Sequence, residues 1–373
     1  MNYFHAYWTR PQLNDAVPPE SQDLELWGFE LLVWVLSALE VQRHSPIRLV
    51  TDARGLRAVR NAGIDWLYHG GISTALERIP RAVDPRVFWA AGKLYAYREV
   101  AAPCVSLDTD AVLWRPLIPS APVMVLHAED RDWVWYKDNQ PMFARYGFEG
   151  PEWDWQLQPC NAGAVCLGDQ RLLQLYTDSA LRFIEDYSDA HRAGATDAVA
   201  ASVAMLFAEQ RLLPMCAGRL GLAVAPITQT QPAAGWLPKN PDCLHLWRAK
   251  LAYKCCPQAR RELVRWLLDH LLTQFPEVRP TLARWKLDAL ETTDLTSGLE
   301  RQDLAQPGLG DLRFCLLQNL RGVVSVTDPV IGVQRRAEEG SLILSAETVT
   351  PEPGASFDLV VAGKEAVSIR REL

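Results

Sequence analysis

Strand-like and helix-like segments alternate along the first 110 residues of the chain, and this alternation restricts the possible folds more than any other feature of the sequence. Short apolar runs with strand character are separated by longer runs that have the 3.6-residue spacing of helices. Alternation with short connections predicts a mainly parallel sheet covered by helices on both faces. In such sheets, ligands bind beyond the carboxyl ends of the strands.

The elements expected in this sheet continue beyond the first 110 residues. Strands are expected at 2–8, 47–51, 65–68, 103–107, 123–127, 162–167 and 222–226, and helices at 23–43 (with Ser21 as N-cap), 52–62, 88–100, 170–187 and 196–213. No element is expected between 131 and 158. A loop of that length in a compact domain is often a lid or a binding loop.

The character of the sequence changes after Pro257. Amphipathic helices are expected at 258–274 and 279–290, followed by short strands at 313–317, 322–326, 341–344, 357–361 and 366–369, with Gly and Pro turns between them. We therefore expect three parts. They are an α/β domain at 1–257, a helical extension at 258–311 and a small β-rich module at 312–373.

Charge and cysteine usage narrow the class of protein. A formal net charge of −7 argues against non-specific nucleic-acid binding, which needs a cationic face. The 8 Cys form no CxxC pair, so their spacing favours reduced thiols in a reducing compartment over a zinc site. The N-terminus lacks the pattern of a signal peptide, and the apolar run 31–39 is too short to span a bilayer. We expect a cytoplasmic protein without a membrane span or a nucleic-acid partner.

Two carboxylates separated by one residue, Asp108 and Asp110, directly follow the buried strand expected at 103–107. Such a pair can share a hard cation and leave coordination positions open for diphosphate oxygens. The cation then neutralises the charge that develops on a departing nucleotide. Asp130 and Asp132 form a second Asp-x-Asp pair after another strand-like run, so the motif by itself is weak evidence.

Three segments together resemble glycosyltransferases of the GT-A type. Residues 88–117, FWAAGKLYAYREVAAPCVSLDTDAVLWRPL, resemble the part of those enzymes with a Lys-bearing helix, a buried strand and Asp-x-Asp. Residues 159–165, PCNAGAV, resemble an Asn-x-Gly strand start beside the donor sugar, and residues 244–250, LHLWRAK, resemble a late His segment. The resemblance covers residues 1–255 and is to the glycogenin-like family and to glycosyltransferases with a DXD-containing sugar-binding region.

This resemblance implies a fold and a metal site. The fold would be GT-A, a Rossmann-like nucleotide-diphospho-sugar transferase domain with a mainly parallel sheet flanked by helices. Asp108, Asp110 and His245 would hold Mn²⁺ or Mg²⁺, and an imidazole ligand suits Mn²⁺ better. The sequence departs from the family after His245, where LWRAK stands in place of the Gly-x-x-Lys-Pro-Trp of glycogenin-like members.

The resemblance also implies roles for individual residues. The donor would be bound by Tyr7, Trp8, Thr9, Asp52, Lys93, Asp108, Thr109, Asp110, Asn161, Gly163 and Lys250. The catalytic residues would be Asp108, Asp110, Asn161 and Asp197. Asp197 and the pair Glu209-Gln210 lie on a helix that presents polar groups to the donor or acceptor in related enzymes. Core packing is an equal alternative for Trp8 and Tyr7, and a solvated helix face is the alternative for Lys93.

The loop at 131–158 is the candidate acceptor site. Its stacking and hydroxyl-binding candidates are Trp133, Trp135, Trp153, Asp154 and Trp155. The alternative is a lid that these aromatic side chains pack onto the core.

The function that we expect is transfer of a sugar from a nucleotide-diphosphate donor, most simply a UDP-sugar, to an acceptor hydroxyl that the sequence does not identify. The resemblance favours retention of configuration. A nucleotidyltransferase is an alternative, but it would normally need a Gly-rich phosphate loop near the first strand, and residues 5–11 contain no Gly. A non-catalytic carbohydrate-binding or nucleotide-sugar-binding protein remains the other alternative.

Overall fold

The computed structural model describes residues 1–13, 24, 26, 28–228, 242–246, 250, 253, 257–285 and the C-terminal strands between 314 and 370. Contacts divide the chain into two compact units. One comprises Met1–Trp247 with Val264–Leu290, and the other comprises Arg248–Leu263 with Glu291–Leu373. The candidate site discussed below lies in the first unit.

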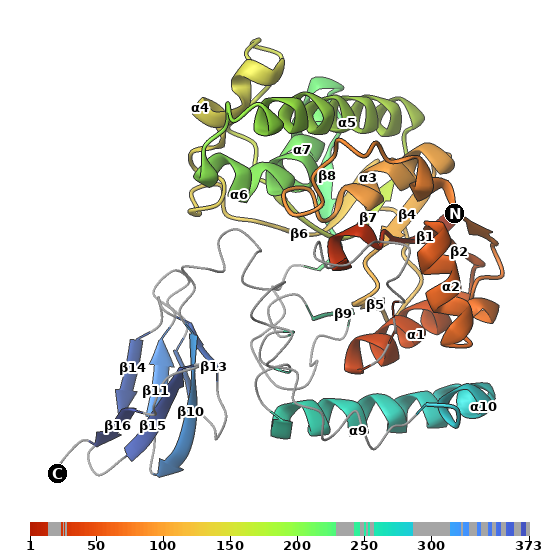
Figure 1. The fold of residues 1–373 in the computed structure, drawn as a ribbon, viewed down its shortest axis with the longest axis vertical. Helices are drawn as coiled ribbons and strands as arrows, with labels where there is room; N and C mark the ends of the chain where they lie inside the picture. The colour runs from red at the N-terminus through yellow and green to blue at the C-terminus, as the bar shows by residue number, and fades with distance from the viewer. Residues whose placement is uncertain are drawn as a thin grey trace. The chain divides into compact units, whose positions relative to one another are not determined.

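A seven-stranded sheet forms the centre of the first unit (Figure 1). Its strands, in spatial order, are β3 (Ile72–Ser73), β2 (Ile47–Thr51), β1 (Asn2–Tyr7), β4 (Cys104–Leu107), β7 (Cys160–Leu167), β6 (Val123–Ala128) and β8 (Val224–Pro226). Only β7 runs against the others, because it pairs antiparallel with both β4 and β6 while the other pairs are parallel. The predicted α/β class with a mainly parallel, Rossmann-like sheet is therefore confirmed.

The order of the strands creates a topological switch point. The chain moves outward from β1 to β2 on one side and later places β4 on the other side of β1. A crevice forms at the carboxyl ends of the two strands on either side of such a reversal, and ligands of open α/β sheets bind there. In this chain the residues at that edge are those that follow Tyr7 and Leu107.

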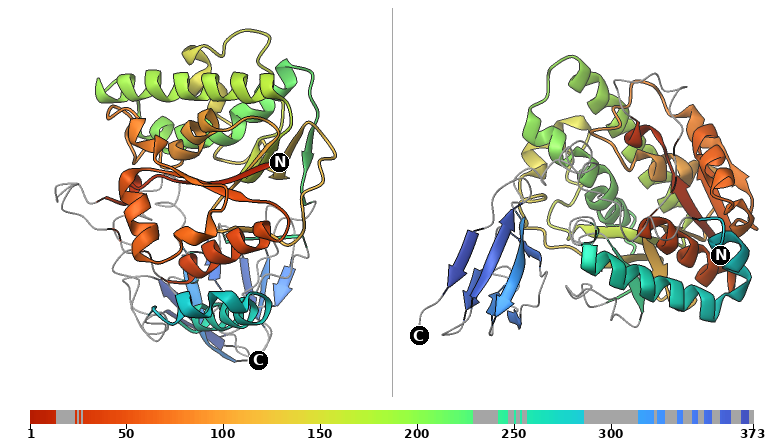
Figure 2. Two further views of the ribbon diagram at one scale, coloured as in Figure 1. Left: turned by 90° about the vertical axis from the view of Figure 1, so that its right-hand side faces the viewer. Right: turned by 60° about the horizontal axis from the view of Figure 1, so that its bottom comes forward.

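Helices cover both faces of the sheet, as the sequence predicts. Helix α1 (Phe29–Gln42) lies on one face, and α3 (Ala91–Ala96) and α5 (Gln170–Arg192) lie on the other (Figures 1 and 2). Helix α1 is buried on nearly all sides because its outer side is covered as well. There Glu40 lies 3.3 Å from His270, in the part of α9 (Pro257–Gln274) that belongs to the first unit. The predicted N-cap Ser21 lies outside the described residues.

The strand predicted at 65–68 is wrong. Asp65–Leu67 form a 3₁₀ turn, and the edge strand is β3, a few residues later. The amide of Gly70 donates to the carbonyl of Ile47, and Gly71 has a φ of 93°, so the chain reverses here before it pairs with β2. The apolar run therefore packs inward as a turn, and only the next segment reaches the sheet.

The remaining elements of the first unit are short, apart from α2. They are η1 (Arg10–Gln12), α2 (Ala53–Asn61), η4 (Ala75–Arg78), η5 (Tyr97–Glu99), β5 (Ala111–Leu113), α4 (Asn139–Phe143), η6 (Ala144–Tyr146), β9 (Cys243–His245), η8 (Pro276–Val278) and α10 (Arg279–Leu282). The loop expected at 131–158 therefore contains helix α4. Strand β9, which the sequence does not predict, pairs with β5.

The segment predicted as one helix at 196–213 is interrupted in the structure. It consists of α6 (Ala198–Leu206), a π-helical turn at Phe207–Arg211 and α7 (Leu212–Arg219). Among the described residues, Ala198–Arg219 is the one stretch with the length and apolar composition of a membrane-crossing helix, and 78% of its apolar window is buried within the fold. It packs as a central helix of the core.

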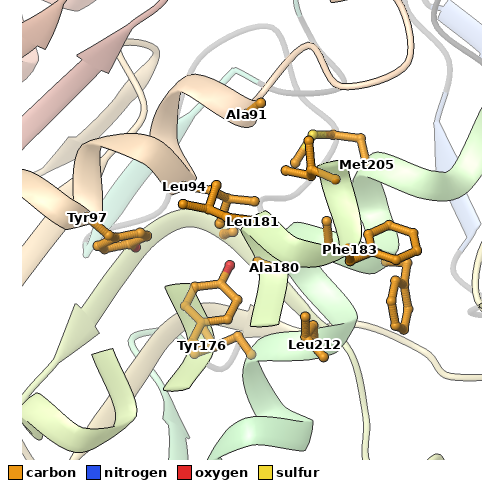
Figure 3. Close-up of a cluster of buried hydrophobic side chains, with 14 of the residues drawn as sticks. Ala91, Leu94, Tyr97, Tyr176, Ala180, Leu181, Phe183, Met205 and Leu212 are labelled. Carbon is orange, nitrogen blue, oxygen red and sulfur yellow. The ribbon is translucent and has the colours of Figure 1, made fainter. Parts of the chain in front are cut away.

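The core on this side of the sheet lies between α3, α5 and the α6–α7 helix. Figure 3 shows Leu94 of α3 and Leu181 of α5 facing each other, with Met205 of α6 beside them. Phe183 is completely buried and contacts the rings of Phe88, Phe143, Phe148 and Phe207. This packing fixes α3 and the π-helical turn relative to the sheet.

The second unit contains two antiparallel β-sheets. One has the order β13 (Leu342–Leu344), β10 (Phe314–Arg321), β15 (Ser356–Val361), β16 (Val367–Arg370). The other has the order β12 (Gln334–Arg336), β11 (Val324–Thr327), β14 (Thr348–Pro351). Each of the five strands expected from the sequence overlaps one of these seven.

We predict that Phe183→Ala lowers the free energy of unfolding by about 3–5 kcal/mol, because it leaves a cavity among the six aromatic rings that contact this side chain. Urea denaturation followed by circular dichroism measures the loss. The matched control is Arg182→Ala, the exposed neighbour on the same helix, which should change stability by less than about 0.5 kcal/mol. Equal effects of the two substitutions would contradict this description of the core.

Candidate metal centre

Asp108 and Asp110 lie in a tight turn between β4 and β5. Strand β4 is entirely buried and ends at Leu107, and the amide of Ala111 donates to the carbonyl of Asp108 at 3.0 Å. The side chain of Asp108 is 31% exposed, whereas that of Asp110 is 8% exposed. The turn thus presents two carboxylates at the edge of the sheet, next to the switch point.

Strand β9 brings His245 to these carboxylates. It pairs antiparallel with β5, so that Ala111 lies opposite His245, and the amide of Leu246 donates to the carbonyl of Asp110 at 3.2 Å. Nε2 of His245 is 3.9 Å from Oδ2 of Asp108 and 3.9 Å from Oδ1 of Asp110. One ligand atom from each residue lies within 4.8 Å of the other two, so the group could hold a metal ion.

Gly163 of β7 makes room for the imidazole of His245. A Cβ atom at position 163 would lie 2.6 Å from Cε1 of His245, which is closer than real contacts of that kind. The carbonyl of Gly163 also accepts a hydrogen bond from the amide of Asp108 at 2.8 Å. Gly163 therefore serves the centre through its backbone and through its lack of a side chain.

Asn161 lies two residues before Gly163, and both polar atoms of its side-chain amide form hydrogen bonds. Its Oδ1 accepts from the amide of Gly163 at 3.0 Å, and its Nδ2 donates to Oε1 of Glu129 at 3.2 Å. Glu129 is 2% exposed and follows the carboxyl end of β6. Glu129 is not among the residues predicted from the sequence, although it follows a buried strand just as Asp108 does.

Lys93 of α3 lies next to Asp108, and its ammonium contacts three oxygen atoms. Its Nζ is 2.5 Å from Oδ1 of Asp108, 2.5 Å from Oε1 of Glu209 and 2.9 Å from the carbonyl of Ala162. A lysine ammonium has three N–H donors, so these contacts account for all of them. The two oxygens of Asp108 thereby differ, because Oδ1 faces Lys93 and Oδ2 faces His245.

Electrostatics keep this buried cation charged. Burial lowers the pKa of Lys93, but the nearby carboxylates of Asp108 and Glu209 outweigh burial and raise its pKa above the usual value. Burial raises the pKa of the Glu209 carboxyl, and Asp108 raises it further, while Lys93 opposes the shift. Two carboxylates, those of Asp108 and Glu209, share this one ammonium, and Asp110 adds a third carboxylate beside His245. This excess of negative charge favours a bound cation.

The π-helical turn positions Glu209. A π-turn redirects side chains and leaves carbonyl groups without helical partners, and such turns are frequent at functional sites. The carbonyl of Glu209 accepts from the hydroxyl of Tyr176 at 2.7 Å, and the carbonyl of Gln210 accepts from the thiol of Cys160 at 3.2 Å. The sequence predicts Glu209 as a polar group on its helix, but the pairing with Lys93 is not predicted from the sequence.

The residues that follow β1 and β2 lie at the same edge and are mostly committed to internal contacts. Oδ2 of Asp52 accepts from both the amide and the hydroxyl of Thr9 at 2.8 Å, and its Oδ1 caps α2 by accepting from Gly55. Tyr7 and Trp8 are 7% and 6% exposed. The structure therefore shows these side chains packed in the core, and their contact with a nucleotide stays a prediction.

The predicted acceptor loop divides into buried and accessible tryptophans. Trp153 is 4% exposed, and Trp155 is 7% exposed, stacks on Phe207 at 5.5 Å and donates to the carbonyl of Phe148. These two rings pack onto the core, as the alternative of an aromatic lid would require. Trp133 and Trp135 are half-buried with centroids 4.6 Å apart, and Asp154 is exposed.

Three further candidates are not among the three candidate metal ligands. Asp197 is exposed and caps α6 by accepting from the amide of Ala200 at 2.7 Å. Thr109 is half-buried in the Asp108–Asp110 turn. Lys250 belongs to the second unit, so its role stays a prediction. The second Asp-x-Asp pair is not part of the one metal-binding group found among the described residues.

Fold and site together define an α/β protein with a candidate Asp-Asp-His metal centre at the switch point of its sheet. Residues 1–279 match the model of DUF6734, a family of unknown function, and the chain belongs to that family. The matched range contains every residue of the centre. No curated protein sequence matches the chain.

We predict that Gly163→Ala weakens Mn²⁺ binding by about tenfold or more, because the added Cβ displaces the imidazole of His245. Isothermal titration calorimetry measures the affinity. Gly150→Ala is the control, since its Cβ would meet only the carboxylate of Glu152, an exposed side chain that can rotate away. Unchanged Mn²⁺ affinity in the Gly163 variant would show that the imidazole is not a ligand.

We predict that Lys93→Met lowers the free energy of unfolding by about 3–5 kcal/mol, because it leaves Glu209 and Asp108 without their cation. In a double-mutant cycle with Glu209→Gln, the combined loss should fall short of the sum by about 1–3 kcal/mol. Chemical denaturation at pH 7 provides the four values. Strict additivity would mean that the ion pair does not couple the two helices.

Proposed function

We propose that the chain is a metal-dependent glycosyltransferase that transfers a sugar from a nucleotide-diphosphate donor, a UDP-sugar in the simplest case, to an acceptor hydroxyl. The observation that carries the proposal is the convergence of Asp108 and Asp110, in the turn after β4, with His245, at the end of β9, next to the switch point of the sheet. That position is where open α/β sheets bind nucleotides. The resemblance of three sequence segments to GT-A glycosyltransferases gives independent support.

The three candidate ligand side chains fit a divalent cation of intermediate softness. Two carboxylates supply hard oxygen ligands, and His245 supplies a nitrogen ligand. Mg²⁺ favours all-oxygen coordination, so the imidazole argues for Mn²⁺. A protein that offers three ligands leaves positions open for two diphosphate oxygens, and the bound cation would neutralise the negative charge of the leaving nucleotide.

The chain's own residues contribute orientation and charge. Lys93 holds Oδ1 of Asp108, so that Oδ2 faces His245 and is kept for coordination. Gly163 lets the imidazole approach the strand closely. Because these groups are fixed by packing before a donor binds, little reorganisation is needed when charge develops on the diphosphate.

The stereochemical outcome that we propose is retention. An inverting transferase needs a carboxylate base for the acceptor hydroxyl. Oε1 of Glu209 is occupied by Lys93, and Glu209 is 4% exposed, so this carboxylate is poorly placed to act as that base. Asp197 is committed to capping α6. Both observations favour the retaining outcome that the sequence resemblance also implies.

The acceptor would be bound near the half-buried pair Trp133 and Trp135, whose rings offer stacking surface for a sugar. We also propose a cytoplasmic location. The five described cysteines, at 104, 160, 166, 216 and 243, are free and buried, as expected in a reducing compartment.

We predict that Asp110→Asn abolishes Mn²⁺-dependent hydrolysis of a nucleotide-sugar, with a loss of at least about 100-fold, while the melting temperature stays close to that of the wild type. A screen of nucleotide-sugars in Mn²⁺ identifies the donor, and release of free sugar measures the rate. Asp132→Asn is the matched control, because it alters the second Asp-x-Asp pair outside the centre.

Together with assays of glycan binding and of pyrophosphate release, this screen separates the proposed transferase from the two alternatives. Normal turnover by Asp110→Asn would refute the assignment of the centre. Glycan binding without metal-dependent nucleotide binding would indicate a carbohydrate-binding protein instead. Release of pyrophosphate from a nucleoside triphosphate would indicate a nucleotidyltransferase.

A further inference from the structure

A chain of buried polar groups lies behind the metal centre, on the α1 side of the sheet. His5 of β1 is completely buried and uses both ring nitrogens. Its Nδ1 is 3.1 Å from the hydroxyl of Tyr68, and its Nε2 is 3.0 Å from Oγ of Ser37. Buried polar groups of this kind need partners, and each group in this chain has one.

The series of hydrogen bonds extends at both ends to groups that can only donate or only accept. At one end, the indole N–H of Trp34 donates to the hydroxyl of Tyr68. At the other end, the hydroxyl of Ser37 is 2.5 Å from the carbonyl oxygen of Ala111. An indole nitrogen can only donate and a carbonyl oxygen can only accept, so the Ala111 end fixes the direction of the hydrogen bonds as far as Nε2 of His5.

The direction of the chain follows from these ends. The single proton of the Ser37 hydroxyl goes to Ala111, and therefore Nε2 of His5 must donate to Ser37. Nδ1 of His5 is then the acceptor for the hydroxyl proton of Tyr68. A neutral His5 in this arrangement is therefore the tautomer with the proton on Nε2.

The charge state of His5 agrees with this arrangement. Burial lowers the pKa of His5 to about 3, and the nearby charge of Asp110 opposes that shift only in part. The imidazole is therefore neutral at physiological pH. A protonated ring would turn Nδ1 into a donor facing the Tyr68 hydroxyl and would reverse that half of the chain.

Ala111, at the end of the hydrogen-bond chain, is connected through its backbone to all three candidate metal ligands. Ala111 directly follows Asp110, and its amide donates to the carbonyl of Asp108 at 3.0 Å. It also lies opposite His245 in the pairing of β5 with β9. A hydrogen bond to the carbonyl of Ala111 therefore acts on the backbone that carries each ligand.

We propose that the chain from Trp34 through Tyr68, His5 and Ser37 to the carbonyl of Ala111 is a positioning network that fixes the backbone of the metal centre. This inference rests on the proposed metal-dependent function. Hydrogen-bond partners behind metal ligands orient them, and their loss typically lowers metal affinity by 10–100-fold. His5, Ser37 and Tyr68 are positioning residues, because their hydrogen bonds lead to the carbonyl of Ala111 and none of the three belongs to the candidate ligand group.

Ser37→Ala tests the network at its last link. We expect Mn²⁺ affinity to fall by about tenfold in calorimetry, because the carbonyl of Ala111 loses its donor. The matched control is Ser188→Ala, which makes the same substitution at a buried serine of α5 whose hydroxyl has no hydrogen-bond partner among the described residues. Tyr68→Phe should weaken binding as well, by removing the proton that Nδ1 of His5 accepts.

A spectroscopic readout separates positioning from general loss of stability. Long-range ¹H–¹⁵N spectra of the wild type should show His5 as the Nε2-protonated neutral tautomer at pH 6, where an exposed histidine is largely charged. In Tyr68→Phe this tautomer should persist, because Ser37 still requires a donor. A cationic His5, or the tautomer with the proton on Nδ1, would overturn the inference.

The outcomes of the calorimetry distinguish this inference from the proposed function. If the wild type binds Mn²⁺ and Ser37→Ala binds it equally well, the network does not position the centre, although the centre itself stands. If the wild type binds no Mn²⁺, the proposed function fails, and the inference fails with it. Equal weakening by Ser37→Ala and Ser188→Ala would mean that stability alone accounts for the effect.

Discussion

The ammonium of Lys93 is the interaction on which the arrangement of the site depends. It lies among Asp108, Glu209 and the carbonyl of Ala162, and so joins helix α3, the turn after β4, strand β7 and the π-helical turn. Without a cation at this point, the two carboxylates would repel each other in a poorly hydrated interior. The aromatic core around Phe183 supports this arrangement by fixing α3 and the π-turn against the sheet.

The backbone around the centre is held from both sides of the sheet. On one side, the carbonyl of Gly163 accepts from Asp108, and Lys93 reaches Ala162 in the same strand. On the other side, Ser37 donates to Ala111 as the last member of a buried hydrogen-bond chain. Support from two faces restrains the backbone that carries Asp108, Asp110 and His245, the group that could hold a metal ion.

Much of the sheet is predictable from local patterns, and the exceptions have physical causes. Strands such as β2 and β4 are short apolar runs with clear boundaries, so their positions follow from the sequence. The run at 65–68 is equally apolar but forms a turn, because Gly70 and Gly71 let the chain reverse before it reaches the sheet. Strand β9 could not be expected, since its three residues become a strand only by pairing with β5.

The sequence by itself determined the class of fold and the carboxylate pair after β4, because alternating periodicity and a polar residue at a strand end are local properties. Tertiary structure alone decided which side chains meet. It brought Glu209 to Lys93 from 116 residues away, buried Trp153 and Trp155 in the core, and set His5 behind the centre. These outcomes depend on packing between distant segments, and the pattern of any one segment does not contain that information.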